Sequence, residues 1–267
     1  MNRLFKFEFR KLFRQKSFYI CGGIAVGLIL LSAFTMNLLL SFSQNATVSA
    51  DGVAVAVVAD DTAFSGLYML ASALSGSDFS IILAVFVALF VCGDYNNGTL
   101  KNIIAKGYNR SSIYVSKYMV SLIASTMLAC VCWLAGLLSG TAFWGIGELP
   151  ADGSVCNFVI ILQLQLLSIY AYTSLFFMIS ALLKKAGGAI AVGIIAPLVV
   201  VMIISMADAF INSETFSLSK YWLDNCYSDL AVTSLPSDTA VRCLVCFAIY
   251  IVVFTTAGHL AYRRHEV

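Results

Sequence analysis

Long apolar stretches separated by short polar connections dominate this chain, and the charge of those connections alternates in sign along it. Hydrophobic residues make up 60% of the 267 residues and charged residues only 11%, which is far from the composition of a soluble protein. A helix needs roughly 20 apolar residues to cross a hydrocarbon core of ~30 Å. Six stretches are predicted to cross it: residues 18–40, 79–93, 113–143, 157–183, 187–210 and 239–262. The predicted fold class is therefore an all-α integral membrane protein.

The distribution of charge predicts the orientation. An even number of crossings places both termini on one side, and all of the 16 Lys and Arg except Lys220 and Arg242 fall on that side. All of the 14 Asp and Glu except Glu8, Asp94 and Glu266 fall on the other side. Because basic loops stay in the cytoplasm, we predict a multi-pass protein of the cell inner or plasma membrane with both termini cytoplasmic. No connection is long enough for a soluble domain, so residues 1–267 are predicted to form one transmembrane domain.

The N-terminal segment, residues 3–16, has the pattern of an amphipathic helix that lies in the membrane interface. Its basic face, with Arg3, Arg10, Lys11 and Arg14, would meet anionic lipid headgroups, and we expect no nucleic-acid partner. The alternative is an ordinary basic flank that only sets the topology. The predicted apolar face consists of Phe5, Phe9, Leu12 and Phe13.

The connection DYNNGTLKNIIAKGYNRSS, residues 94–112, predicts a short helix on the cytoplasmic side. Thr99 is placed to cap the start of this helix, and Gly107 is placed to end it. Leu100, Ile103 and Ile104 share one face at helical spacing. Because so short a helix is marginal in water, this face needs lipid or a protein partner. The alternative is that the connection packs on its own membrane domain.

The same connection resembles the first cytoplasmic loop of the type-2 ABC exporter permeases. The resemblance lies in Asp94-x-x-x-Gly98-Thr99-Leu100, the short helix that follows, Gly107-Tyr108-x-Arg110 and Lys117. The family often has Glu at the position of Asp94. The N-terminal helix, the six spans and the small inner loops are also similar to this family. Within it, the chain resembles small bacterial permeases that export amphipathic toxin peptides or confer bacteriocin immunity.

This resemblance implies the membrane subunit of an ATP-driven exporter that moves hydrophobic or amphipathic cargo, with peptide favoured, out of a bacterial cell. The subunit would pair with a second permease copy, as a homodimer or a heterodimer, and with two copies of an ABC ATPase. The sequence has no P-loop, so we expect a chain that is not an enzyme and carries no cofactor, with ATP and Mg on the ATPase. The residues assigned to ATPase coupling are Leu100, Lys101, Ile103, Ile104, Lys106, Gly107 and Arg110.

Polar residues inside the spans are candidates for a substrate route, namely Asn37, Gln163, Tyr170 and Ser174. Interhelical hydrogen bonding is the alternative for them, and also for Gln165. Pro197 is the candidate kink of the fifth span. Residues 64–74 predict a helix on the outer surface. Asp78 is expected at the outer end of its span, so no charge is expected near the bilayer midplane, which disfavours coupling to an ion gradient.

Two other function classes differ from an exporter. A membrane enzyme is disfavoured because the chain has two His and no paired intramembrane carboxylates. A metal site that uses Cys243 and Cys246 is excluded because both His lie at or beyond the far end of that span. A membrane receptor, sensor or scaffold without an ATPase partner stays open as the alternative function.

Overall fold

The structure is a computed structural model that describes residues 2–45, 65–74, 77–96, 98–99, 103, 105–147, 155–211, 217–230 and 235–264. These residues form helices and the turns between them, and the described part contains no strand. In chain order the helices are α1 (Asn2–Arg14), α2 (Lys16–Asn45), α3 (Gly66–Ser72), α4 (Ser77–Asn96), α6 (Arg110–Trp144), α7 (Val155–Leu183), α8 (Ala186–Ile211), η2 (Leu218–Tyr221), α9 (Leu223–Ser228) and α10 (Ser237–Arg264).

Six helices of the described residues are long and apolar enough to cross a membrane, namely α2, α4, α6, α7, α8 and α10. They correspond one by one to the six predicted spans, and the all-α membrane fold is confirmed. Each helix extends a few residues beyond its apolar stretch, except that α7 ends at Leu183 as predicted. The apolar run fixes where a span lies, whereas capping residues and hydrogen bonds in the flanks decide where the helix ends.

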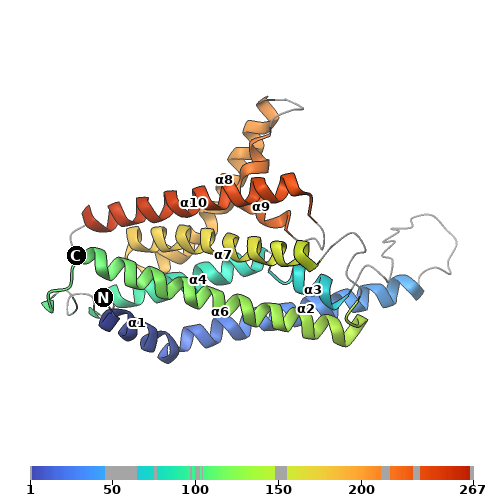
Figure 1. Cartoon of the computed structure of the whole chain (residues 1–267), viewed down its shortest axis with the longest axis horizontal. Coiled ribbons are helices and arrows are strands. Elements are labelled where there is room, and N and C mark those ends of the chain that lie inside the picture. Colours follow the sequence, from blue (N-terminus) through green and yellow to red (C-terminus); the bar gives the residue numbers. More distant parts are fainter. Residues whose placement is uncertain are drawn as a thin grey trace.

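Helix α7 is the centre of the bundle. It packs against α4, α6, α8 and α10, and it is the most buried of the six spans, whereas α8 is the least buried. Figure 1 shows α4, α6, α7 and α10 running side by side, while the end of α8 points away from the others. The polar residues of α7 therefore face protein on several sides, and the apolar residues of α8 are left exposed.

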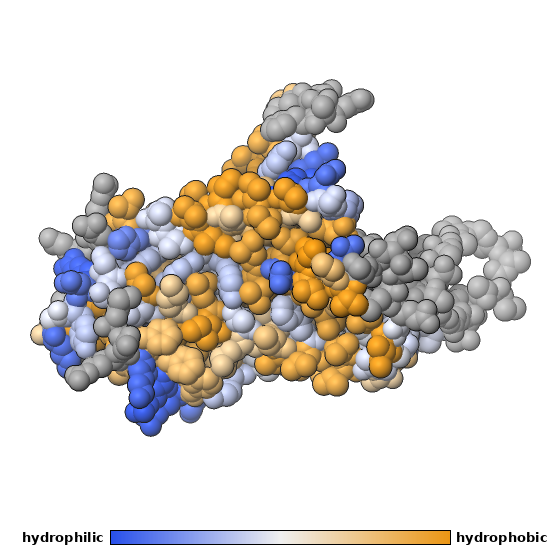
Figure 2. Space-filling view, in the orientation of Figure 1, coloured by the Kyte–Doolittle hydropathy of each residue, from blue (hydrophilic) through white to orange (hydrophobic). Residues whose placement is uncertain are grey.

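The two ends of the bundle differ in character. The first residues of α1 and the last residues of α10 lie at the same end (Figure 1), as six crossings require. We call this the basic end, because Lys11 and Lys117 lie there, and the other the acidic end. In the space-filling view apolar residues cover most of the middle of the bundle, and hydrophilic residues gather at the basic end around α1 (Figure 2).

Helix α3 lies at the acidic end of the bundle. It falls within residues 64–74, for which the sequence predicts a helix on the outer surface. It is docked into α6 because two glycines leave room for its backbone: a Cβ on Gly136 would lie 2.7 Å from the carbonyl oxygen of Met69, and a Cβ on Gly140 2.8 Å from the Cα of Gly66. Met69 is 7% exposed and Ala71 is fully buried. Helix α3 is therefore an integral part of the packing, as small residues allow in membrane helices.

Candidate functional site

Asp94 joins three elements at the basic end of the bundle. It lies in the last turn of α4 with only 1% of its surface exposed. Its carboxylate forms ion pairs with Lys11 of α1 and with Lys117 of α6. It also accepts a hydrogen bond of 2.8 Å from the hydroxyl of Thr99, in the connection that follows α4. Asp94 therefore fixes α1, α6 and the start of this connection relative to α4.

The two lysines differ in how firmly they are held. The side chain of Lys117 is 3% exposed, whereas that of Lys11 is 27% exposed. Each ammonium also lies near an aromatic ring: Lys11 is 5.9 Å from the ring centroid of Phe90, and Lys117 is 6.0 Å from that of Tyr95. A buried ion pair that loses one partner leaves an uncompensated charge, which is strongly destabilising. Loss of Asp94 would therefore leave a more costly unpaired charge at Lys117 than at Lys11.

A second carboxylate, Glu8 of α1, is fully buried beside this cluster. Neither of its oxygens has a hydrogen-bond partner among the described residues. Burial raises the pKa of Glu8 above its usual 4.5; Lys117 and Lys11 oppose that shift, and Asp94 adds to it. We call Glu8, Lys11, Asp94 and Lys117 the ion cluster.

The connection between α4 and α6 packs on its own chain at Ile103. This side chain is 9% exposed and forms a small apolar cluster with Leu4 of α1 and Ile113 of α6, flanked by Tyr95 and Tyr108. For Ile103 the structure thus agrees with the alternative that the connection packs on its own membrane domain. The connection and α1 are in contact through this apolar cluster as well as through Asp94.

The other residues assigned to ATPase coupling lie in different surroundings. Lys106 and Gly107 are exposed, and Gly107 has a φ of 84°, which favours glycine at the end of the short helix. Arg110 begins α6 and is half-buried. Leu100, Lys101 and Ile104 lie outside the described residues. The exposed residues of this connection in its described part are Ala105, Lys106, Gly107 and Asn109, of which Lys106 is charged.

Helix α1 turns one face toward the protein, and this face differs from the apolar face predicted from the sequence. Leu4, Glu8 and Leu12 are buried, and α1 packs on α6 and α2. Among the predicted face residues, Leu12 is fully buried, Phe5 and Phe9 are half-buried against the core, and Phe13 is 39% exposed. In the sequence, the four-residue spacing of Leu4, Glu8 and Leu12 was the signal that could have indicated this buried face.

The candidate route residues do not line one path. Tyr170 pairs with Thr126 at 3.0 Å, and Ser174 pairs with Tyr118 at 2.7 Å, so both form hydrogen bonds between α6 and α7. Gln163 is exposed and lines a cavity of about 650 Å³ between α7 and α10. Asn37 is half-buried on α2.

Gln165 is the polar residue of α7 with the most partners. Its amide nitrogen donates to the carbonyl oxygens of Ala71 at 2.6 Å and Leu230 at 3.1 Å, and its amide oxygen accepts from the indole of Trp133 at 3.1 Å. Gln165 thus ties α3, α6 and the segment after α9 to α7. The structure thus agrees with interhelical hydrogen bonding, the alternative that the sequence offered for Gln165.

Pro197 lies inside α8, which continues as a helix through it. It lines a cavity of about 290 Å³ together with Phe176 of α7 and Asp224 of α9. The part of α8 that points away from the bundle in Figure 1 is its acidic end. No group of three or more His, Cys, Asp or Glu side chains in the described ranges is placed to hold a metal ion.

A family described as "Protein of unknown function (DUF2705)" matches residues 25–267. No curated protein matches the chain.

Proposed function

The chain belongs to the DUF2705 family, whose function is unknown, and we propose from its own residues that it is the membrane subunit of an ATP-driven type-2 ABC exporter. The observation that carries this proposal is the link that Asp94 makes between α1, α4, α6 and the connection 94–110. A force applied to this connection would act on three helices together. Such a link is what a membrane subunit needs if another chain hydrolyses the ATP.

The proposal assigns the basic end to the cytoplasm of a bacterial cell. Both termini and the connection 94–110 then face the side that holds ATP, and the protein resides in the inner or plasma membrane. The exposed residues Lys106 and Gly107 are available to an ATPase, whereas Ile103 is not. The chain itself would carry no catalytic residue; ATP and Mg would be bound by two ATPase copies, and a second permease copy would complete the transporter.

The cargo is proposed to be hydrophobic or amphipathic, with an amphipathic peptide favoured. The surfaces of α2, α8 and α10 are largely apolar, with exposed side chains such as Leu31, Met202 and Val252. Cargo of this kind is soluble in the membrane and can reach the protein from within it. The antimicrobial peptides and toxins of the resembling permeases are of this kind.

The test is co-purification of this chain with a candidate ATPase, followed by measurement of ATP hydrolysis with and without the chain. We expect a stable complex with altered hydrolysis. Lys106→Glu should weaken the complex, and the matched control Lys185→Glu, an exposed lysine in the connection between α7 and α8, should not. No association with the native chain would contradict the proposal and favour a receptor, sensor or scaffold.

A further inference from the structure

Helix α3 lies beyond the start of α4, toward the acidic end of the bundle (Figure 1). Helix α3 ends at Ser72 and α4 begins at Ser77. From Asp94 in the ion cluster to Asp78 an α-helix rises about 24 Å, whereas from Lys117 to Trp144 helix α6 rises about 40 Å. The start of α4 is therefore about 16 Å short of the end of α6, and α3 fills that remaining length.

Asp78 lies at the outer end of its own helix, as the sequence indicated, but not at the end of the bundle. It is the first residue of the candidate span Asp78–Tyr95 and is exposed on the surface of the structure. Ionisable residues within transmembrane segments are rare and usually serve a substrate or ion.

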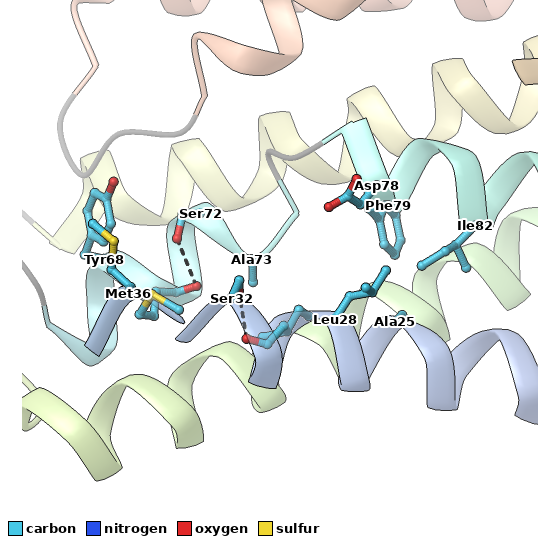
Figure 3. A pocket seen from close by; sticks show the side chains of 12 residues that line it. Ala25, Leu28, Ser32, Met36, Tyr68, Ser72, Ala73, Asp78, Phe79 and Ile82 are labelled. Atoms are coloured by element: carbon cyan, nitrogen blue, oxygen red, sulfur yellow. Dashed lines mark hydrogen bonds between the residues drawn. The ribbon is translucent and has the colours of Figure 1, made fainter. Parts of the chain in front are cut away.

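Asp78 has no hydrogen bond or ion pair among the described residues. It lies on the edge of two adjoining cavities along the seam between α2 and α4. One, of about 300 Å³, is shared with α3; the other, of about 280 Å³, extends toward Cys21. Leu28 and Ile82 line both cavities, so the two form a continuous apolar slot with a single carboxylate. Figure 3 shows Asp78 at the start of α4, above Leu28 of α2.

The polar groups of the slot favour a ligand that donates hydrogen bonds. Ser32 of α2 donates its own hydroxyl proton to the carbonyl oxygen of Ile29 at 2.8 Å (Figure 3), so toward the slot it can only accept. Asp78 when ionised is acceptor only. Ser72 of α3 likewise donates to the carbonyl oxygen of Met69 at 3.4 Å, and Tyr68 is the other polar side chain of the wall. The remaining walls consist of apolar side chains such as Ala25, Ile29 and Phe79. A phosphate headgroup would be repelled by the carboxylate, whereas an ammonium would be attracted.

We propose that the slot between α2, α3 and α4 binds an amphiphile with a primary ammonium head, with the ammonium on Asp78 and the apolar tail along Leu28 and Ile82. This deepens the proposed function, because it names organic cations as the class of cargo that the exporter recognises. Binding itself requires only this chain. It can therefore be measured independently of any ATPase.

The experiment measures binding of tritiated dodecylammonium to the purified full chain in nanodiscs of phosphatidylcholine, with dodecanol as the uncharged probe. Asp78→Asn should bind dodecylammonium about tenfold more weakly, since a charge-assisted hydrogen bond of about 1.4 kcal/mol is lost, and should bind dodecanol as the native chain does. The matched control is Asp238→Asn, which removes the same charge from the first turn of α10, away from both cavities.

A second variant keeps the test decisive if Asp78→Asn does not fold. Leu28 is 38% exposed and lines both cavities, so Leu28→Trp fills the slot from its open side. It should abolish saturable binding of both probes. Native binding of dodecylammonium by either folded variant, or an equal loss in Asp238→Asn, would overturn the proposal. Failure of ATPase association with intact binding would instead count against the exporter alone.

Discussion

Replacing Asp94 by Asn is the change that tests the ion cluster most directly. The amide keeps the shape of the side chain and can still accept from Thr99, but it removes the charge that faces Lys11 and Lys117. Lys11 is 27% exposed and can turn its ammonium to the surface, so little energy is lost there. The side chain of Lys117 is 3% exposed and cannot turn its ammonium to the surface. It is therefore left as a buried, unpaired cation.

The expected loss of stability follows from Lys117. Breaking a buried ion pair by removing one partner costs about 3–5 kcal/mol. We expect a value near the lower limit, about 3 kcal/mol, because the nearby Glu8 can ionise and partly compensate. For a chain of this size about 3 kcal/mol corresponds to a melting temperature lower by about 6–12 °C. The double variant Asp94→Asn with Lys117→Met should recover most of this loss, since apolar replacement of a buried pair is often nearly neutral.

The assay is thermal unfolding in detergent, followed by the reaction of Cys92 with a fluorogenic maleimide. Cys92 is fully buried and lies two residues before Asp94, so it reports on this end of α4. All other cysteines are first changed to Ala in the native and variant chains alike, so that only Cys92 reacts; these are the exposed Cys130 and Cys156 and the buried Cys21, Cys132, Cys226, Cys243 and Cys246. A melting temperature of Asp94→Asn within 2 °C of the native value, or no recovery in the double variant, would refute the view that Asp94 holds α1 and α6 together.

Three further changes test other parts of the structure by the same unfolding assay. Gly140→Leu should displace α3 from α6 and lower the melting temperature, because even its Cβ would lie 2.8 Å from the backbone of Gly66; Gly27→Leu, with nothing within 4 Å, should not. Gln165→Leu should cost about 2–3 kcal/mol by leaving buried backbone carbonyls unpaired, whereas Gln163→Leu on the exposed side of α7 should fold as the native chain does. Because burial raises the pKa of Glu8 in the folded state, the native chain should gain stability relative to Glu8→Gln as the pH falls from neutral toward 4.5. A stability difference that does not change with pH would show that the pKa of Glu8 is not raised by folding.

The sequence was sufficient for the spans but not for the contacts between them. Apolar length depends on the residues of one segment alone, so all six spans could be placed from it. Asp94 and Lys117 were recognised only as parts of a pattern, and Lys11 was assigned to an outward basic face. Helical spacing gives the faces of α1 but cannot tell which of them meets lipid and which meets protein. That choice depends on Asp94, which lies 83 residues further along the chain.

The surroundings of Asp78 could not be predicted for a related reason. Hydropathy does not reveal that α3 packs into the bundle near the start of α4. The space for α3 is left in α6 by Gly136 and Gly140. The sequence of one helix thus decides what lies near the start of another, and only the packed structure relates the two.

The pair Gly136-x-x-x-Gly140 has a consequence for how copies of this chain can associate. In membrane helices this spacing is commonly the surface through which two separate chains dimerise. Here the groove is already occupied by α3 of the same chain, so its two small residues serve tertiary folding and are closed to a neighbour. A second copy would have to use another surface, such as the exposed flank of α8, the least buried of the six spans. Predicting an oligomer of this chain from the glycine pair would therefore point to a surface that α3 already covers.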